Sequence, residues 1–292
     1  MARLFDVEPL PNTTFGAVIR GIKVADIDEP TFRALYDTWL QYALVILPDQ
    51  HLQRDQQIAF AKRFGPLEFE MTAISNVRSD GTLRLEKDND DVMKILKGNM
   101  GWHHDSTYMP VQAKGAVFSA EEVPTIGGRT GFADMRAAYD ALDAATKARI
   151  EGLSAHHSLH YSQSKLGHQA KKADGEYSGY GFHDGPVPLR PLVKTHPETG
   201  RKSLYVNPIH IQRIVGLSHE DSESLIDELF TYMVQPGADY RHVWQKGDIV
   251  VWDNRSSIHS ATGGYPIAER RIHWRVTIME DAAADSNLTR AA

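Results

Sequence analysis

The stretch Arg271-Ile272-His273-Trp274-Arg275-Val276-Thr277-Ile278 alternates strictly between two kinds of side chain. Successive side chains of a β-strand point to opposite faces, so one face presents two arginines, a histidine and a threonine, and the other is apolar. Because the polar residues are flanked by residues of buried type, we do not assign them to a solvated edge strand. An apolar outer face under helices and a polar inner face together favour a barrel lined with functional groups.

Other parts of the chain predict further strands, with helices inserted between them. We expect strands at 43–47, 115–120, 129–132, 192–195, 203–207, 248–252 and 271–279, and helices at 31–42, 53–64, 134–151 and 219–234. Residues 68–98 and 165–188 show little periodicity, and we expect two surface loops there, the first an active-site lid. A mainly β chain with many short strands and inserted helices favours an antiparallel sandwich or jelly roll.

No internal repeat and no linker divides the 292 residues, so we expect a single catalytic domain over 1–292 with a frayed tail from 282. The net charge of −6 and the lack of a basic block argue against nucleic acid as a partner. No stretch reaches the roughly 18 apolar residues of a membrane span, and the N-terminus lacks the apolar core of a signal peptide. A cytoplasmic location without membrane attachment is therefore expected.

The absence of cysteine limits the strong metal ligands to His, Asp and Glu. In Trp102-His103-His104-Asp105, a strand would turn His103 and Asp105 to one face and His104 to the other. This His-x-Asp pattern is weak alone, but His259 supplies a second imidazole 154 residues after Asp105. Two histidines and one carboxylate on one side of a metal ion are typical of non-haem iron(II) oxygenases.

Two arginines of the alternating stretch fit the same chemistry. Arg271 and Arg275 would lie roughly 13 Å apart at ~3.3 Å per residue. A guanidinium group stays charged and binds carboxylates through two hydrogen bonds, so each arginine is suited to hold one acid. His273 shares their strand face, where it either lines the cosubstrate pocket or serves as a buried core residue.

Several segments together resemble one family, the taurine dioxygenase group of iron(II)/2-oxoglutarate-dependent dioxygenases. They are Trp102-His103-His104-Asp105, Gly127-Gly128-Arg129-Thr130, Trp252-Asp253-Asn254-Arg255 through His259, and Arg270-Arg271-Ile272-His273-Trp274-Arg275. Within the group, the chain is most similar to aryloxyalkanoate dioxygenases, which degrade phenoxy herbicides. That likeness runs through Gly98–Pro110 and Phe132–Asp140, and it continues in His157–Gly167 and Pro191–Gly200.

The resemblance implies a cupin-like jelly roll, the double-stranded β-helix, and it implies a role for each of seven residues. His103, Asp105 and His259 would hold Fe(II) as the catalytic set, and Thr130 and Arg271 would bind the distal carboxylate of the cosubstrate 2-oxoglutarate. Arg275 would bind the acid of the primary substrate, and Asn99 falls where the taurine enzyme contacts its substrate. The lid at 68–98 would set the choice of substrate.

The sequence thus predicts an oxidoreductase that uses Fe(II), 2-oxoglutarate and O2 to hydroxylate the carbon next to the carboxylate of an aryloxyalkanoic acid. The ether would then cleave to a phenol and a keto or aldehyde acid, with succinate and CO2 as co-products. A taurine-type alkylsulfonate dioxygenase is the alternative within the family, and a metal-bound jelly-roll binding module without turnover is the alternative outside it. We expect a small-molecule carboxylic acid as substrate and a homo-oligomeric assembly.

Overall fold

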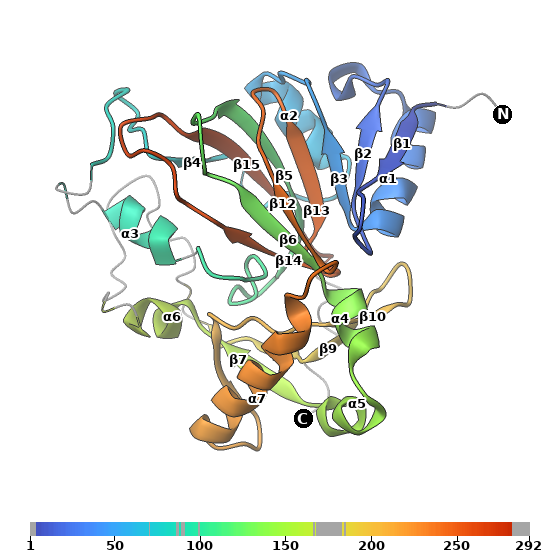
Figure 1. The fold of residues 1–292 in the computed structure, drawn as a ribbon, viewed down its shortest axis with the longest axis vertical. Helices are drawn as coiled ribbons and strands as arrows, with labels where there is room; N and C mark the ends of the chain where they lie inside the picture. The colour runs from blue at the N-terminus through green and yellow to red at the C-terminus, as the bar shows by residue number, and fades with distance from the viewer. Residues whose placement is uncertain are drawn as a thin grey trace.

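In the computed structural model, the described residues are 4–69, 71–85, 88, 91–98, 100–165, 167, 183 and 185–281. Seven strands form a large sheet (Figure 1). In spatial order they are β1 (Asp6–Pro9), β2 (Ala17–Arg20), β3 (Leu44–Leu47), β13 (Ile249–Asp253), β5 (Ala113–Glu122), β15 (Ile272–Met279) and β4 (Thr72–Ser75). All neighbouring pairs are antiparallel except β2 and β3.

A second sheet of three strands lies against the large one. Its order is β12 (Asp239–His242), β6 (Thr130–Asp134) and β14 (Ser257–Ala261). A buried apolar cluster joins the two sheets, with Phe118 and Trp252 from the large sheet packed among Phe132 and Trp244. Two facing antiparallel layers confirm the predicted jelly roll.

Helices cover the opposite face of the large sheet. Helix α1 (Glu29–Tyr42) and helix α2 (Arg54–Lys62) follow the short 3-10 helix η1 (Val24–Asp26). The apolar side of β15, represented by Val276 and Ile278, packs against Trp39 and Phe60 of these helices. The division of β15 into a helix-covered face and an inner face is therefore confirmed.

The remaining elements form a third region below the two sheets in Figure 1. It contains β7 (Ser154–His157), β8 (Leu189–Pro191), β9 (Val193–Thr195), β10 (Lys202–Leu204), β11 (Ile211–Ile214), α4 (Met135–Ala141), α5 (Ala144–Ile150), α6 (Leu159–Lys165) and α7 (His219–Met233). Strands β11, β7 and β8 pair in one small sheet, and β9 and β10 form a hairpin. The core of this region packs Ala133 and Ile258 of the second sheet against α7, which fixes β6 and β14 from outside.

Two expectations were wrong. The single helix at 134–151 is two helices, because Leu142 is extended (ψ 142°) and the Asp143 carboxylate accepts a hydrogen bond from the Thr146 amide to start α5. The segment 68–98 is not an unstructured loop. It contains β4, which pairs with β15, and α3 (Asp91–Gly98). Most of the expected loop at 165–188 and the tail from 282 lie outside the described residues.

Candidate active site

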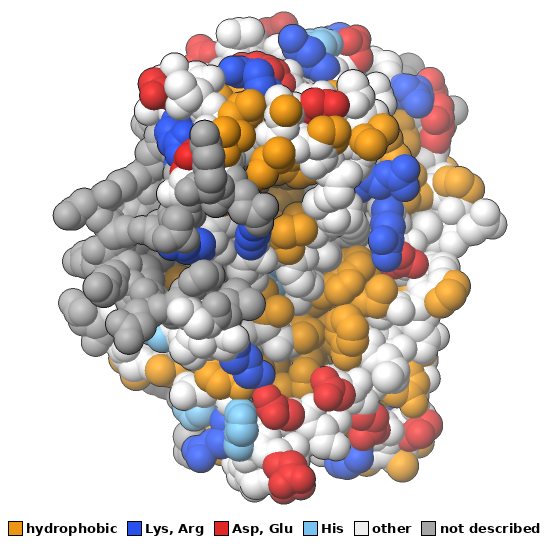
Figure 2. Space-filling model, turned by 60° about the vertical axis from the view of Figure 1, so that its left-hand side comes forward, with side chains coloured by type: hydrophobic (Ala, Val, Ile, Leu, Met, Phe, Trp, Pro, Cys, Tyr) orange, Lys and Arg blue, Asp and Glu red, His pale blue; other side chains and the backbone are white. Residues whose placement is uncertain are grey.

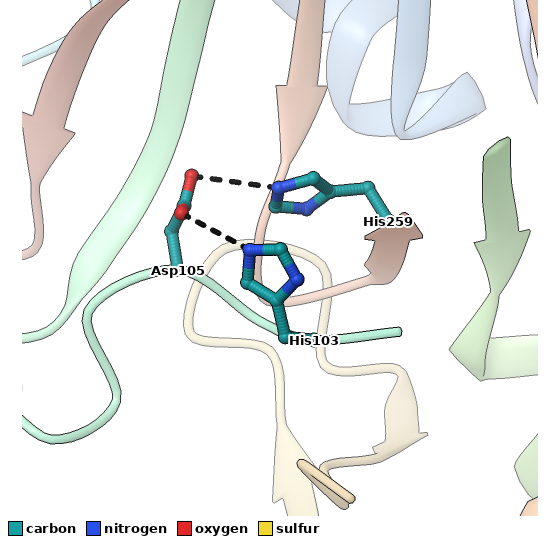
Figure 3. Close-up of side chains that lie close together, drawn as sticks. All are labelled: His103, Asp105 and His259. Carbon is teal, nitrogen blue, oxygen red and sulfur yellow. Dashed lines mark ion pairs between the residues drawn. The ribbon is translucent and has the colours of Figure 1, made fainter. Parts of the chain in front are cut away.

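The three predicted metal ligands converge in the structure. His259 is in β14, and its backbone exchanges two hydrogen bonds with His103, at 2.9 and 3.1 Å. Asp105 follows in a turn and points between the two imidazoles (Figure 3). His103 Nε2 is 3.7 Å from Asp105 Oδ1, and His259 Nε2 is 3.8 Å from Asp105 Oδ2. All three side chains are buried, so this is an interior cluster.

The local reason for this convergence differs from the expected one. His103 makes a single strand-type bridge, but the chain turns at once, so the alternation of a strand does not place Asp105. Asn254 does, because its side chain accepts a hydrogen bond from the Asp105 amide at 2.8 Å and donates to the Asp105 carbonyl at 3.0 Å. His104 points away, as expected, and its Nδ1–H donates to the Asn254 carbonyl at 2.9 Å. Burial lowers the pKa of His104 to about 3, so it is a neutral structural residue.

The protonation states suit a divalent cation. His103 Nδ1–H donates to the Gly101 carbonyl at 2.8 Å, which leaves the Nε2 lone pair facing Asp105. Burial lowers the pKa of His259 well below its ordinary value, so its imidazole is neutral. Burial opposes ionisation of Asp105, but Arg275, His259 and His103 together outweigh it and hold the pKa of that carboxyl well below its usual range. Asp105 Oδ2 is buried and has no hydrogen-bond partner among the described residues. Two buried imidazoles with Nε2 facing the carboxylate, and a carboxylate that is incompletely hydrogen-bonded, fit iron(II).

A pocket opens beside these ligands, between the two sheets. Its walls carry His103, His259, Thr130, Arg271, Arg275, Arg129, Ser75, Asn76, Lys97, Gly128, Gly263 and the apolar side chains of Ile74, Met93, Met100, Phe118, Trp252, Ala261 and Tyr265. Figure 2 shows hydrophobic side chains gathered around a hollow on one face of the molecule. The segment expected to form a lid supplies Ile74 and Asn76 from the region of β4, and Met93 and Lys97 from α3.

Arg271 enters this pocket without a carboxylate partner among the described residues. Within the described residues its guanidinium donates to the Gly128 carbonyl, at 3.3 and 3.4 Å, and lies 6.0 Å from the Tyr265 ring centroid. Gly128 has φ +62°, and a Cβ there would lie 3.2 Å from Arg271 Nε, so glycine permits this close approach. Burial lowers the pKa of Arg271 to about 10, which still leaves it charged at neutral pH. A buried cation of this kind is suited to bind an anionic ligand.

Arg275 takes a different position from Arg271. It lines the same pocket, and its Nη1 donates to Asp105 Oδ1 at 2.9 Å. The arginine expected to hold the substrate acid therefore also contacts Asp105, one of the three predicted metal ligands.

His273, for which two interpretations were open, packs as a core residue. It is fully buried and stacks on Phe118, with ring centroids 5.0 Å apart, and it is not among the pocket-lining residues. Asn99 lies outside the described residues.

Three asparagines that support the site were not predicted. Besides Asn254, Asn207 donates to the His104 carbonyl and to Thr107 Oγ1, which fixes the turn around the metal ligands. Asn76 accepts a hydrogen bond from the Arg271 amide at 2.8 Å. Asn254 stands within the segment Trp252–Arg255 already noted, whereas no local pattern marks Asn76 or Asn207.

Comparison with known proteins agrees with this geometry. Residues 6–277 match the model of the taurine catabolism dioxygenase TauD, TfdA family. The chain belongs to this family. It is therefore an oxidoreductase of the dioxygenase class, with iron(II), 2-oxoglutarate and O2 as its cofactor and cosubstrates.

Two similar relatives are named for a phenoxypropionate substrate. A (S)-phenoxypropionate/alpha-ketoglutarate-dioxygenase of Sphingobium herbicidovorans is 64% identical over 99% of both chains. An enzyme of the same name from Delftia acidovorans is 54% identical over 85% of this chain and 86% of its own. Among solved structures, AAD-2 in complex with Mn(II) and N-oxalylglycine superposes with a TM-score of 0.84 and 36% identity, over 94% of this chain and 96% of that one.

Membrane insertion of a helix finds no support in the structure. Within the described ranges, no helix combines the length and the apolar composition needed to cross a bilayer.

Proposed function

We propose that residues 1–292 form one catalytic domain that hydroxylates an aryloxyalkanoic acid, with an (S)-2-aryloxypropionate as the preferred substrate. The observation that carries this proposal is the His103, Asp105 and His259 cluster, which opens into a pocket with three arginines and several apolar lining residues. The names of the two bacterial relatives support the aryloxy class and the (S) configuration.

His103, Asp105 and His259 would hold the iron, and the neutral His259 imidazole, the His103 ring fixed by its Nδ1–H hydrogen bond and the ionised Asp105 carboxylate suit that role. When bound, iron(II) supplies the activation of O2 that hydroxylation of an unactivated C–H bond requires. Asn254 would act through Asp105, because its two hydrogen bonds hold the backbone of that ligand in place. Such supporting contacts typically change metal affinity by about 10–100-fold when removed.

Arg271 and Thr130 would bind the distal carboxylate of 2-oxoglutarate. Arg271 offers a buried charge with no carboxylate partner in the described part of the chain, and Thr130 adds a hydroxyl on the facing strand β6. A bound carboxylate would offset the desolvation of the guanidinium, which makes this end of the pocket selective for a dicarboxylate.

Arg275 and Asn99 would bind the primary substrate. One Nη of Arg275 reaches Asp105, and a guanidinium has five N–H donors, so the same group can also hold the carboxylate of the substrate. Ile74, Met93 and Met100 would surround the aromatic ring, and this lid region would set substrate choice. Fixing the acid presents the adjacent carbon to the metal ligands, which is a positioning contribution to the rate.

The reaction then follows from the chemistry of the product. O2 and 2-oxoglutarate are consumed, one oxygen atom enters succinate as CO2 is lost, and the other enters the C–H bond between the ether oxygen and the carboxylate. The hydroxylated carbon carries two oxygens and collapses, which releases a phenol and a 2-keto acid. From 2-phenoxypropionate these products are phenol and pyruvate.

A coupled assay tests this proposal. Purified protein with Fe(II), ascorbate and 2-oxoglutarate is given each phenoxypropionate enantiomer, phenoxyacetate or taurine, and succinate and phenol are measured. We expect succinate and phenol in equal amounts, with the (S) enantiomer turned over fastest. Succinate formed only with taurine, together with sulfite, would replace the aryloxy substrate by a sulfonate. No stimulated succinate with any of them would contradict the substrate class.

The homo-oligomeric assembly and the cytoplasmic location remain predictions. Light scattering on the purified protein and fractionation of the producing cell would test them.

A further inference from the structure

Trp244 donates a hydrogen bond to Thr130 directly behind the pocket. The distance between Trp244 Nε1 and Thr130 Oγ1 is 3.0 Å, and the two side chains are 6% and 5% exposed. Thr130 lines the pocket at the start of β6, whereas Trp244 is not a lining residue. Trp244 follows β12, the strand that pairs with β6 (Figure 1). In this pairing, His242 of β12 lies opposite Thr130. The indole therefore approaches the hydroxyl from behind the pocket wall.

The direction of this hydrogen bond is fixed by the chemistry of the two groups. An indole N–H can only donate, and a hydroxyl has one proton to donate and two lone pairs with which to accept. Because Thr130 Oγ1 accepts from Trp244, its single proton must point elsewhere. The Thr130 hydroxyl would then be oriented to donate its proton to a ligand acceptor in the pocket, such as a carboxylate oxygen.

Three rings hold the indole in place. Its ring centroid lies 4.5 Å from that of His242, 4.7 Å from that of His273 and 5.2 Å from that of Phe118, each near edge-to-face. His242 is itself held, because its Nε2 lies 3.1 Å from Asp248 Oδ2. The buried His273 thus gains a role as part of a ring cage rather than as a ligand.

We propose that Trp244 is a positioning residue for 2-oxoglutarate, acting through the Thr130 hydroxyl. This inference rests on the proposed role of Thr130 in binding the distal carboxylate. The indole N–H would restrict the hydroxyl to the rotamer that donates into the pocket. The cosubstrate would then not have to reorient that hydroxyl when it binds, which favours affinity by preorganisation.

The test compares two 2-oxo acids in the variant Trp244→Phe. Affinities are measured by calorimetry on the Fe(II)-loaded protein without oxygen, for 2-oxoglutarate and for pyruvate, which lacks a distal carboxylate. We expect Trp244→Phe to weaken the binding of 2-oxoglutarate by about fivefold, the usual factor for one neutral hydrogen bond. The affinity for pyruvate should not change. Equal weakening of both acids would mean that Trp244 only packs the site, and would overturn the inference.

A second set of variants separates this inference from the proposed function. Thr130→Val should weaken 2-oxoglutarate, and in that background Trp244→Phe should have no further effect. If Thr130→Val weakens 2-oxoglutarate and Trp244→Phe alone does not, the positioning role fails and the function stands. If Thr130→Val has no effect, the cosubstrate assignment fails as well.

Folding is controlled in two ways. Trp39→Phe removes a fully buried indole whose N–H has no partner in the described residues and which packs in the core between α1 and the large sheet, outside the pocket lining. It should lower the thermal midpoint without changing either affinity. If Trp244→Phe does not fold, replacing Trp244 by benzothienylalanine keeps the ring shape and removes only the N–H, and the same fivefold loss for 2-oxoglutarate is expected.

Discussion

Two buried aspartates, Asp253 and Asp105, each pair with an arginine, and they differ in how completely they are satisfied. Asp253 accepts from Arg255 at 2.8 and 3.1 Å and lies 2.8 Å from His196 Nε2. Asp105 accepts a hydrogen bond from Arg275 at 2.9 Å, but its Oδ2 has no hydrogen-bond partner among the described residues, and its two imidazole neighbours lie 3.7 and 3.8 Å away. The hydrogen-bonding capacity of Asp253 is filled by the protein itself, and we call this the closed site. That of Asp105 is only partly filled, and we call this the incomplete site.

The arginines show the same contrast. Arg255 also pairs with Glu198 at 2.8 Å, whereas Arg271 has no carboxylate partner in the described residues and contacts the Gly128 carbonyl and the Tyr265 ring instead. A buried charge is expensive unless it is paired, so an unpaired one indicates that a ligand completes it. Low pKa values do not distinguish the two aspartates, since in both an arginine and neighbouring histidine groups together outweigh burial and lower the pKa. The distinguishing feature is whether the hydrogen-bonding capacity is filled.

The largest expected effect of a single change is at the incomplete site. His259→Ala should reduce succinate formation to the background rate, because it removes an imidazole ligand, and even outer partners of such ligands are worth about 10–100-fold. The circular dichroism spectrum should be unchanged, since His259 Nδ1 makes no hydrogen bond among the described residues. His104→Phe is the matched control, since it changes a neighbouring histidine that points away from the cluster and should keep iron binding. Substantial activity in His259→Ala would contradict the ligand assignment.

At the closed site the expected effect is on stability. Arg255→Met should lower the free energy of unfolding by about 3–5 kcal/mol, because it leaves the Asp253 carboxylate buried and without its guanidinium partner. Urea unfolding measures the loss. The control Arg149→Met breaks an ion pair with Glu228 whose side chains are 50% and 41% exposed, and it should cost less than about 1 kcal/mol. If both variants lose the same amount, Arg255 is not the structural partner inferred here.

The sequence predicted the elements whose pattern is local. The alternation at 271–278 identified β15 and both of its faces because helices and the pocket impose opposite demands on them. Strand β4 was not predicted, because it is a short edge strand defined by its pairing with β15, about 200 residues away in the sequence. The break between α4 and α5 was missed because the apolar spacing runs on through Leu142, while the Asp143 cap acts in one turn only.

Prediction of the site followed the same rule. His103, Asp105 and His259 could be named because metal ligation restricts residue types, and the structure brings the three together. The roles of Asn254 and Trp244 could not be predicted, because each acts through hydrogen bonds to a segment more than 100 residues away, two for Asn254 and one for Trp244. Such contacts leave no spacing in the sequence. They become visible only when the fold places the two segments side by side.

The smallest expected effect is at Arg271, the arginine without a carboxylate partner in the described residues. Arg271→Met should raise the KM for 2-oxoglutarate at least about 30-fold, which corresponds to the roughly 2 kcal/mol lost when one partner of a buried charge pair is removed. Unlike Arg255→Met, it should leave the free energy of unfolding without cosubstrate unchanged or higher, because a desolvated cation is replaced by an apolar side chain. Arg270→Met, at an exposed arginine paired with Glu122, is the control and should alter neither quantity. A large loss of stability in Arg271→Met with normal cosubstrate KM would show that Arg271 is a second closed site, and the contrast between the two regions would fail.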